Sequence, residues 1–235
     1  MKKMTLSQHF AELRRRILWV AAVFVGAFLL GMMVAPWIQQ CLTWPLMNIW
    51  PDGTLLYTGL ADGLMINFSL AGLFALLITL PFGLWQLWMF VEPGLKKNER
   101  RFIWPVLVLS PGLFLLGAGF AFFVLFPVVF KFFVELNQVA PVPSVLMPAV
   151  RDYLGFAIGM LKVFGIAFQL PLVLVLLNRI GVLKKNQMIA ARRYAIILIV
   201  VVAAILTPPD IVSQLLLAIP MWLLFEISIL CMRHD

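Results

Sequence analysis

The sequence predicts an all-α integral membrane protein: a single domain over residues 1–235, built as a kinked, concave bundle of six transmembrane helices. Of the 235 residues, 63% are apolar and only 12% are charged, which is more apolar surface than a soluble domain of this length can bury. Uncharged runs such as Ile17–Trp37 and Ala71–Phe90 exceed the roughly 18 residues that indicate a spanning helix. Because these runs are continuously apolar and do not alternate, a transmembrane β-barrel is excluded.

The first expected element is a cytoplasmic interfacial helix over residues 1–16 that runs into a first span at 17–38. Apolar residues recur there at the spacing of one helix face: Leu6, Phe10, Leu13 and Ile17. The apolar run that follows is too long for the core of a secretory signal peptide, so we interpret it as a retained span.

A long loop over 39–63 should follow and form an ordered cap on the outer face, because its tryptophans suit the headgroup region. The next spans are expected at 64–91, 102–133 and 153–177. Nearly every span contains proline, which removes a helical hydrogen bond and can bend the helix. These prolines predict the kinks.

The last two spans, at 194–206 and 211–232, are unusual because the first of them is short. Thirteen residues cover roughly 20 Å, whereas the hydrocarbon core is about 30 Å thick. The pair could be two short spans that thin the bilayer or a re-entrant hairpin with "TPPD" at its tip. We favour two spans, because the tip aspartate, Asp210, requires water.

The loops differ sharply in charge. Nearly all of the 18 lysines and arginines precede the first span or follow the second, fourth and sixth spans. The positive-inside rule therefore predicts that both termini are cytoplasmic. The net charge of +8 is explained by this orientation and by anionic lipid, so we expect no nucleic-acid partner.

Few residues are suited to catalysis. The only histidines are His9 and His234, and Cys41 and Cys231 are the only cysteines; two cysteines do not make a zinc site. Neither a metalloprotease motif nor a phosphate-binding glycine loop occurs in the sequence. We therefore expect no enzymatic activity, no cofactor and no metal.

Two carboxylates stand out on the basic cytoplasmic face, Glu12 and Glu99. Glu12 has Arg15 and Arg16 three and four residues further on, and an ordinary ion pair within the helix would explain it. Glu99, within "KKNERR", could simply relieve charge repulsion. Alternatively, the two acids form a site for a guest cation, for which arginine is suited because its guanidinium grips a carboxylate with two hydrogen bonds.

Three polar residues lie within the predicted spans: Lys162, Gln169 and Glu226. Such residues are costly in a membrane and usually face a bundle interior or a wet cavity. They could be a functional polar path, or a structural pair of Glu226 with Lys162 or with Gln169.

Five motifs together resemble the TatC family, the C subunit of the twin-arginine protein translocase. They are "HFAELRRRIL", "FVEPGLKKNERR", "FGIAFQLPLVL", "TPPD" and "LLAIPMWLLFEISI". They occur in the family's order and cover the chain from Thr5 to about Arg233. The resemblance implies six spans with a short fifth and sixth, cytoplasmic termini and a bacterial-type inner-membrane location.

The resemblance also implies a role and its residues. A family member is the receptor for the twin-arginine signal peptides of folded cargo. Transport of that cargo is driven by the proton-motive force. By position, the signal-peptide residues are Glu12, Glu99, Leu95, Arg14 and Arg16, and Pro45 and Asp210 match functional outer-loop positions. The implied partners are single-span subunits of the TatA and TatB type, bound through the fifth and sixth spans, and further copies of the chain in a hetero-oligomer.

The chain departs from the family pattern at three positions. Gln169 stands where many members have glutamate, and a neutral amide cannot take part in proton transfer. Lys96 replaces a tyrosine, and Asp62 replaces a glutamate. The alternatives to the receptor are a small-solute or ion transporter with a polar path, and a passive assembly scaffold. The transporter is disfavoured because no inverted repeat is evident.

Overall fold

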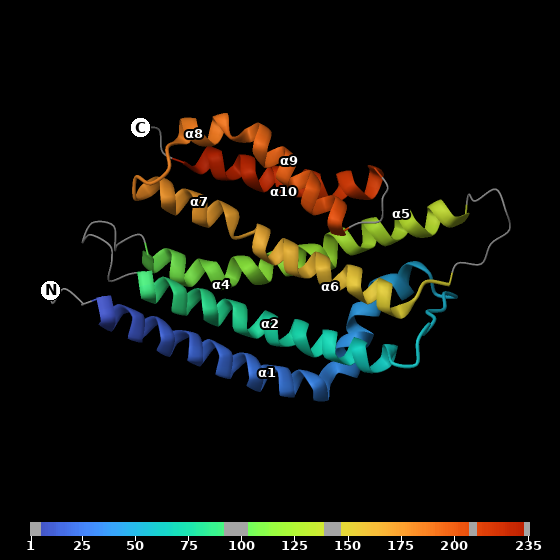
Figure 1. The fold of residues 1–235 in the computed structure, drawn as a ribbon. Helices are drawn as coiled ribbons and strands as arrows, with labels where there is room; N and C mark the ends of the chain where they lie inside the picture. Colours follow the sequence, from blue (N-terminus) through green and yellow to red (C-terminus); the bar gives the residue numbers. More distant parts are fainter. Residues whose placement is uncertain (1–5, 92–102, 139–146, 207–210, 233–235) are drawn as a thin grey trace.

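The structure is a computed structural model that describes residues 6–91, 103–138, 147–206 and 211–232. Nearly all of them are helical. Figure 1 labels the helices, whose bounds are α1 Leu6–Ile49, α2 Asp62–Val91, α4 Ile103–Phe120, the π-helical turn η2 Ala121–Leu125, α5 Phe126–Gln138, α6 Val150–Ala167, α7 Leu170–Arg179, α8 Lys185–Ala190, α9 Arg192–Leu206 and α10 Ile211–Cys231. Within this part of the chain, five helical segments are long and apolar enough to cross a membrane, so the prediction of an all-helical polytopic membrane protein is confirmed.

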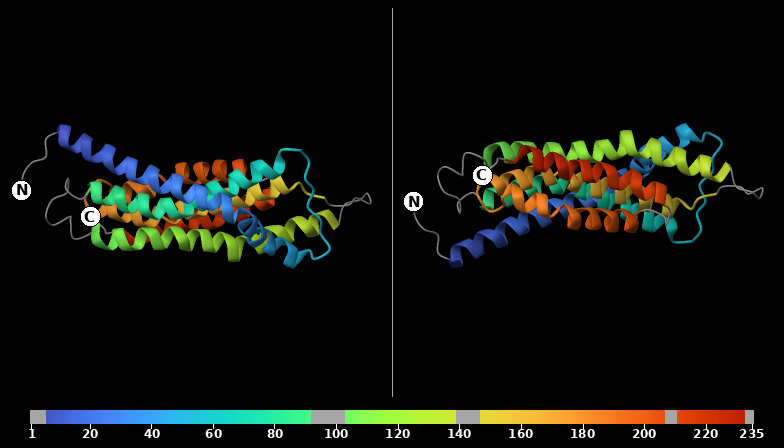
Figure 2. Two further views of the ribbon diagram at one scale, coloured as in Figure 1. Left: turned by 90° about the horizontal axis from the view of Figure 1, so that it is seen from below. Right: turned by 90° about the horizontal axis from the view of Figure 1, so that it is seen from above.

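The long helices lie side by side, and α1 begins and α10 ends at the same end of the bundle (Figure 1). Helix α1 packs along α2 on the outside, and Figure 2 shows that it slants relative to the other helices. Helix α6 lies inside the bundle and contacts α1, α2, α4, α9 and α10. Its buried residues, such as Leu154, Met160 and Phe164, pack at the centre of the main apolar core.

Helix α1 is longer than the sequence predicted. The expected outer loop over 39–63 is helical as far as Ile49, although Pro36 and Pro45 lie within the helix. The buried hydroxyl of Tyr153 on α6 donates to the Leu42 carbonyl oxygen at 2.7 Å, which ties this end of α1 to the core. The rest of the loop is held because Leu56 exchanges two backbone hydrogen bonds of 3.0 Å with the segment before α6, accepting from Val150 and donating to Pro148.

Two predicted spans are each interrupted at a proline. The span expected at 102–133 is α4, η2 and α5, with a π-helical turn immediately before Pro127. A π-turn accommodates the carbonyl oxygen that proline cannot pair. The span expected at 153–177 is α6 and α7, separated at Phe168 and Gln169, with Pro171 in the first turn of α7.

Helices α9 and α10 pack against one another. Helix α9 has 15 residues, about 22 Å of helix at 1.5 Å per residue, and it is therefore shorter than the five candidate spans. Helix α10 has 21 residues and is one of the five. The "TPPD" tip, with Asp210, lies outside the described residues.

Candidate functional site

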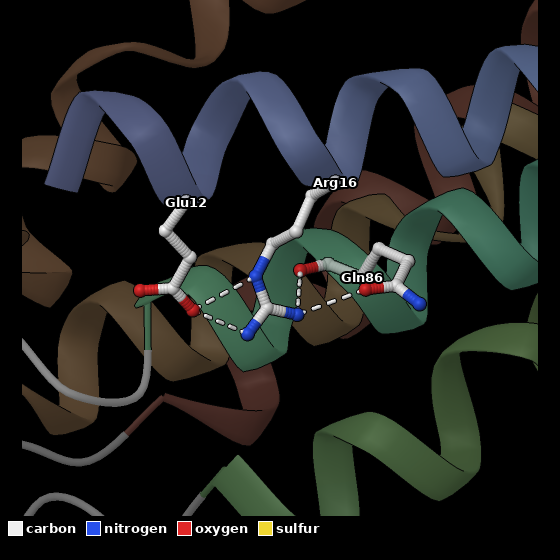
Figure 3. Close-up of polar contacts among 3 residues, drawn as sticks. All are labelled: Glu12, Arg16 and Gln86. Carbon is white, nitrogen blue, oxygen red and sulfur yellow. Dashed lines mark hydrogen bonds and ion pairs between the residues drawn. The ribbon is translucent and has the colours of Figure 1, made fainter. Parts of the chain in front are cut away.

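The predicted acid Glu12 lies at one end of the bundle, in a polar contact between α1 and α2 (Figure 3). Arg16 donates from Nε and Nη2 to Glu12 Oε1, at 3.0 and 2.5 Å. The other terminal nitrogen, Nη1, donates to the Gln86 side-chain oxygen at 2.8 Å, with a longer 3.5 Å contact to the Gln86 backbone oxygen. One guanidinium therefore bridges a carboxylate on α1 and an amide on α2.

Local helix geometry accounts for this arrangement. Glu12 and Arg16 are four residues apart on α1, and an acid that precedes a base at this spacing places the two side chains on the same face. Helices α1 and α2 pack along most of their length and run in opposite directions. The start of α1 therefore lies beside the end of α2, where Gln86 lies five residues before Val91.

Gln86 was not among the residues predicted from the sequence. It is a lone uncharged polar residue between Trp85 and Leu87 in an apolar run. An amide near the end of a span is compatible with simple exposure to headgroups, so its type alone did not distinguish it. The signal that could have found it is the antiparallel pairing of the first two spans, which puts it level with Glu12.

The site is partly withdrawn from solvent. The Glu12 and Arg16 side chains are 23% and 18% exposed, and the second oxygen of Glu12, Oε2, is buried without a hydrogen-bond partner among the described residues. The three residues, with Arg15 and Trp19, line a cavity of about 260 Å³. Arg14 is exposed and does not line this cavity.

A carboxylate, an amide oxygen and an indole ring around one cavity suit a planar cation. Guanidinium groups bind carboxylates through paired hydrogen bonds and stack on aromatic rings. Among the described residues, no group of three or more His, Cys, Asp or Glu side chains could hold a metal ion. The Glu12 carboxylate, the Gln86 amide and the Trp19 ring can therefore make the contacts that a guanidinium requires.

Comparison with known proteins gives the family. The model of the Sec-independent protein translocase protein TatC matches residues 8–220. The chain belongs to the TatC family. It is 36% identical to the TatC of Desulforapulum autotrophicum over 99% of this chain and 85% of that protein. It is also 36% identical to the TatC of Escherichia coli K12, over 97% of this chain and 88% of that protein.

A solved structure agrees with the fold of this TatC-family chain. The crystal structure of a TatC described as the twin-arginine translocase receptor matches with a TM-score of 0.86 and 33% identity, and covers 95% of this chain and 97% of that one. The recognised family is thereby confirmed. Two of the implied signal-peptide positions, Leu95 and Glu99, fall within 92–102, outside the described residues.

The polar residues within the spans do not form the pairs expected from the sequence. Gln169 is buried and pairs with Ser110 on α4: Ser110 Oγ donates to Gln169 Oε1 at 2.9 Å, and Gln169 Nε2 donates to the Ser110 backbone oxygen at 2.6 Å. Glu226 on α10 accepts from Arg192 on α9 at 2.7 Å. The structural pair that the sequence left as one alternative, Glu226 with Lys162 or with Gln169, is not formed, because Glu226 pairs with Arg192 and Gln169 pairs with Ser110.

Two residues expected in the first outer loop, Pro45 and Asp62, lie in helix α1 and at the start of α2. Pro45 is buried within α1. Asp62 begins α2 and accepts from the Gly59 amide at 2.6 Å and from the Thr58 amide and hydroxyl at 3.0 and 2.9 Å. A short aspartate fits this turn because the donors to its carboxylate are only three and four residues away.

Proposed function

We propose that this chain is the signal-peptide receptor and core subunit of a twin-arginine translocase, which exports folded proteins at the expense of the proton-motive force and is not an enzyme. In this proposal, Glu12 and Glu99 bind the two arginines of the signal peptide. Leu95 contacts the peptide beside them.

The observation that carries the proposal is the guanidinium between Glu12 and Gln86. The Arg16 guanidinium donates to the Glu12 carboxylate on one side and to the Gln86 amide oxygen on the other, which supports a site where these two groups bind a guanidinium. The surrounding field is positive, since Arg14 and Arg15 flank the site on α1. A guest cation must therefore be held by close charge-assisted hydrogen bonds and not by the general charge of the surface.

The second proposed acid follows α2 in the sequence. Helix α2 ends at Val91, at the end of the bundle where α1 begins. Residues 92–102, which contain Leu95 and Glu99, follow directly in the sequence and lie outside the described residues. Two acids, Glu12 and Glu99, match in number the two cations of a twin-arginine motif.

In the membrane, helices α9 and α10 are the fifth and sixth spans of this proposal. Two spans are favoured over a re-entrant hairpin because α10 is long enough to cross the bilayer. Both termini are cytoplasmic in a bacterial inner membrane, in accord with the positive-inside rule and with bacterial relatives. Apolar side chains exposed on α9 and α10, among them Ile197, Ile205, Leu215 and Leu230, are available for lipid, for single-span partner subunits of the TatA and TatB type, and for further copies of the chain.

The test is the affinity of the purified chain for a twin-arginine signal peptide. Glu12→Ala and Glu99→Ala should each weaken binding by about 1–3 kcal/mol, because each leaves one charge-assisted pair unmade. Glu135→Ala is a matched control, since this exposed acid on α5 forms an ion pair with Lys131 on its own helix. Unchanged affinity in both site variants would refute the receptor site and leave the passive scaffold.

The transporter alternative gains no support from the structure. A polar path through the bundle would require Lys162, Gln169 and Glu226 to communicate. Gln169 instead pairs with Ser110, and Glu226 pairs with Arg192 near the ends of α9 and α10.

A further inference from the structure

The carboxylate proposed to receive a signal-peptide arginine already pairs with an arginine of the chain itself. Arg16 directs two nitrogens at a single oxygen of Glu12 and a third at Gln86. These are the contacts a guest guanidinium would make. We propose that Arg16 is an internal competitor, an autoinhibitory ligand that the first arginine of the signal peptide displaces from Glu12.

The inference rests on the proposed function and adds a residue that sets its affinity. Three neighbouring cations follow Glu12, yet only Arg16 pairs with it in the structure; Arg14 and Arg15 are exposed. The side chain of Arg16 is 18% exposed, so its pairing is less screened by water than a surface ion pair is. The guest must therefore replace a formed interaction.

Simple competition has a defined signature. When only the fraction of molecules with a free Glu12 can bind, the apparent dissociation constant of every guest rises by the same factor. Removing the competitor should thus strengthen the binding of twin-arginine and twin-lysine peptides by the same factor and leave the ratio of their dissociation constants unchanged. If Arg16 instead positioned Glu12 for the guest, removing it would weaken binding and alter the ratio.

The experiment compares Arg16→Met with Arg15→Met, in the wild-type and the Glu12→Gln backgrounds, using twin-arginine and twin-lysine peptides. Methionine retains an unbranched apolar stem without donors. Arg15 is the matched control, because it lines the same cavity and its loss removes the same charge. Circular dichroism and the melting temperature in detergent report whether each variant is folded.

We expect Arg16→Met to tighten the binding of both peptides by about fivefold to tenfold, and by more than Arg15→Met does. Arg15 lines the cavity without pairing with Glu12, so its loss removes only a positive charge. In the Glu12→Gln background, the advantage of Arg16→Met over Arg15→Met should vanish, because the contested carboxylate is gone. A folded Arg16→Met variant that binds more weakly, or no more tightly than Arg15→Met, overturns the competitor. If Glu12→Gln and Glu99→Ala both leave binding unchanged, the proposed function itself fails.

Discussion

Gln169 and Ser110 satisfy each other where α4 meets the junction of α6 and α7. The amide is needed in this geometry, because its nitrogen donates to the Ser110 backbone oxygen while its oxygen accepts from the Ser110 hydroxyl. An ionised carboxylate could make only the second contact. The glutamine that departs from the family pattern is therefore explained by its neighbour in this chain, which the sequence could not show since 59 residues separate the two.

We expect Gln169→Leu and Ser110→Ala each to lower the free energy of unfolding by about 1 kcal/mol, the usual range for hydrogen bonds between membrane helices. The double variant should lose less stability than the sum of the two single variants, because both substitutions remove the hydrogen bond between Ser110 Oγ and Gln169 Oε1. Thermal unfolding in detergent measures this. Ser69→Ala is the control, since that exposed hydroxyl contacts only its own helix. Strict additivity of the two variants would show that the pair is not coupled.

Two of the three residues in the polar contact between α1 and α2 were predictable from the sequence. Glu12 was predictable because a carboxylate in a strongly basic segment is conspicuous. Arg16 as its partner followed from the spacing of four residues. Gln86 was not predictable, because its role depends on which turn of α2 lies beside Glu12.

At the scale of elements, close helix packing is set by small residues. A Cβ atom at Gly117 on α4 would collide with the Phe164 backbone oxygen on α6, and one at Gly31 on α1 would lie 2.9 Å from the Ala71 backbone on α2. Both obstacles are backbone atoms, so no side-chain rotation relieves them. These glycines therefore hold two helix pairs at short separation, the expected device in membrane bundles.

Gly117→Ala should destabilise the protein by about 1–3 kcal/mol, because the added methyl group forces α4 and α6 apart. Gly112→Ala is a control on the same helix with no atom within 4 Å of the new Cβ. It should be neutral or slightly stabilising, since alanine favours helix over glycine. Equal melting temperatures for the two variants would contradict the close approach seen at Gly117.

The positions of the spans were largely predictable, but their interruptions were not. Hydropathy locates apolar runs irrespective of their neighbours. Proline does not by itself decide where a helix breaks: Pro36, Pro81 and Pro220 lie within continuous helices, whereas Pro171 separates α6 from α7. The interruptions therefore do not follow from the presence of proline alone.

At the scale of the whole molecule, two cavities lie at opposite ends of the bundle. The small polar cavity between α1 and α2 lies where α1 begins. A larger apolar cavity of about 1010 Å³, lined by residues such as Trp50, Ser69 and Phe133, lies where α1 ends and α2 begins. The proposed signal-peptide site is therefore at the opposite end of the bundle from the larger cavity.

Photo-crosslinking in membranes from position 86 tests most directly whether the twin arginines bind beside Glu12. A substitution at position 86 leaves the Glu12 carboxylate intact. A photoreactive residue there should crosslink to the twin-arginine region of a bound signal peptide, and excess unlabelled peptide should abolish the product. The same residue at position 69, in the apolar cavity, should not reach the arginines. Crosslinking of the twin-arginine region from position 69 but not from position 86 would contradict the account.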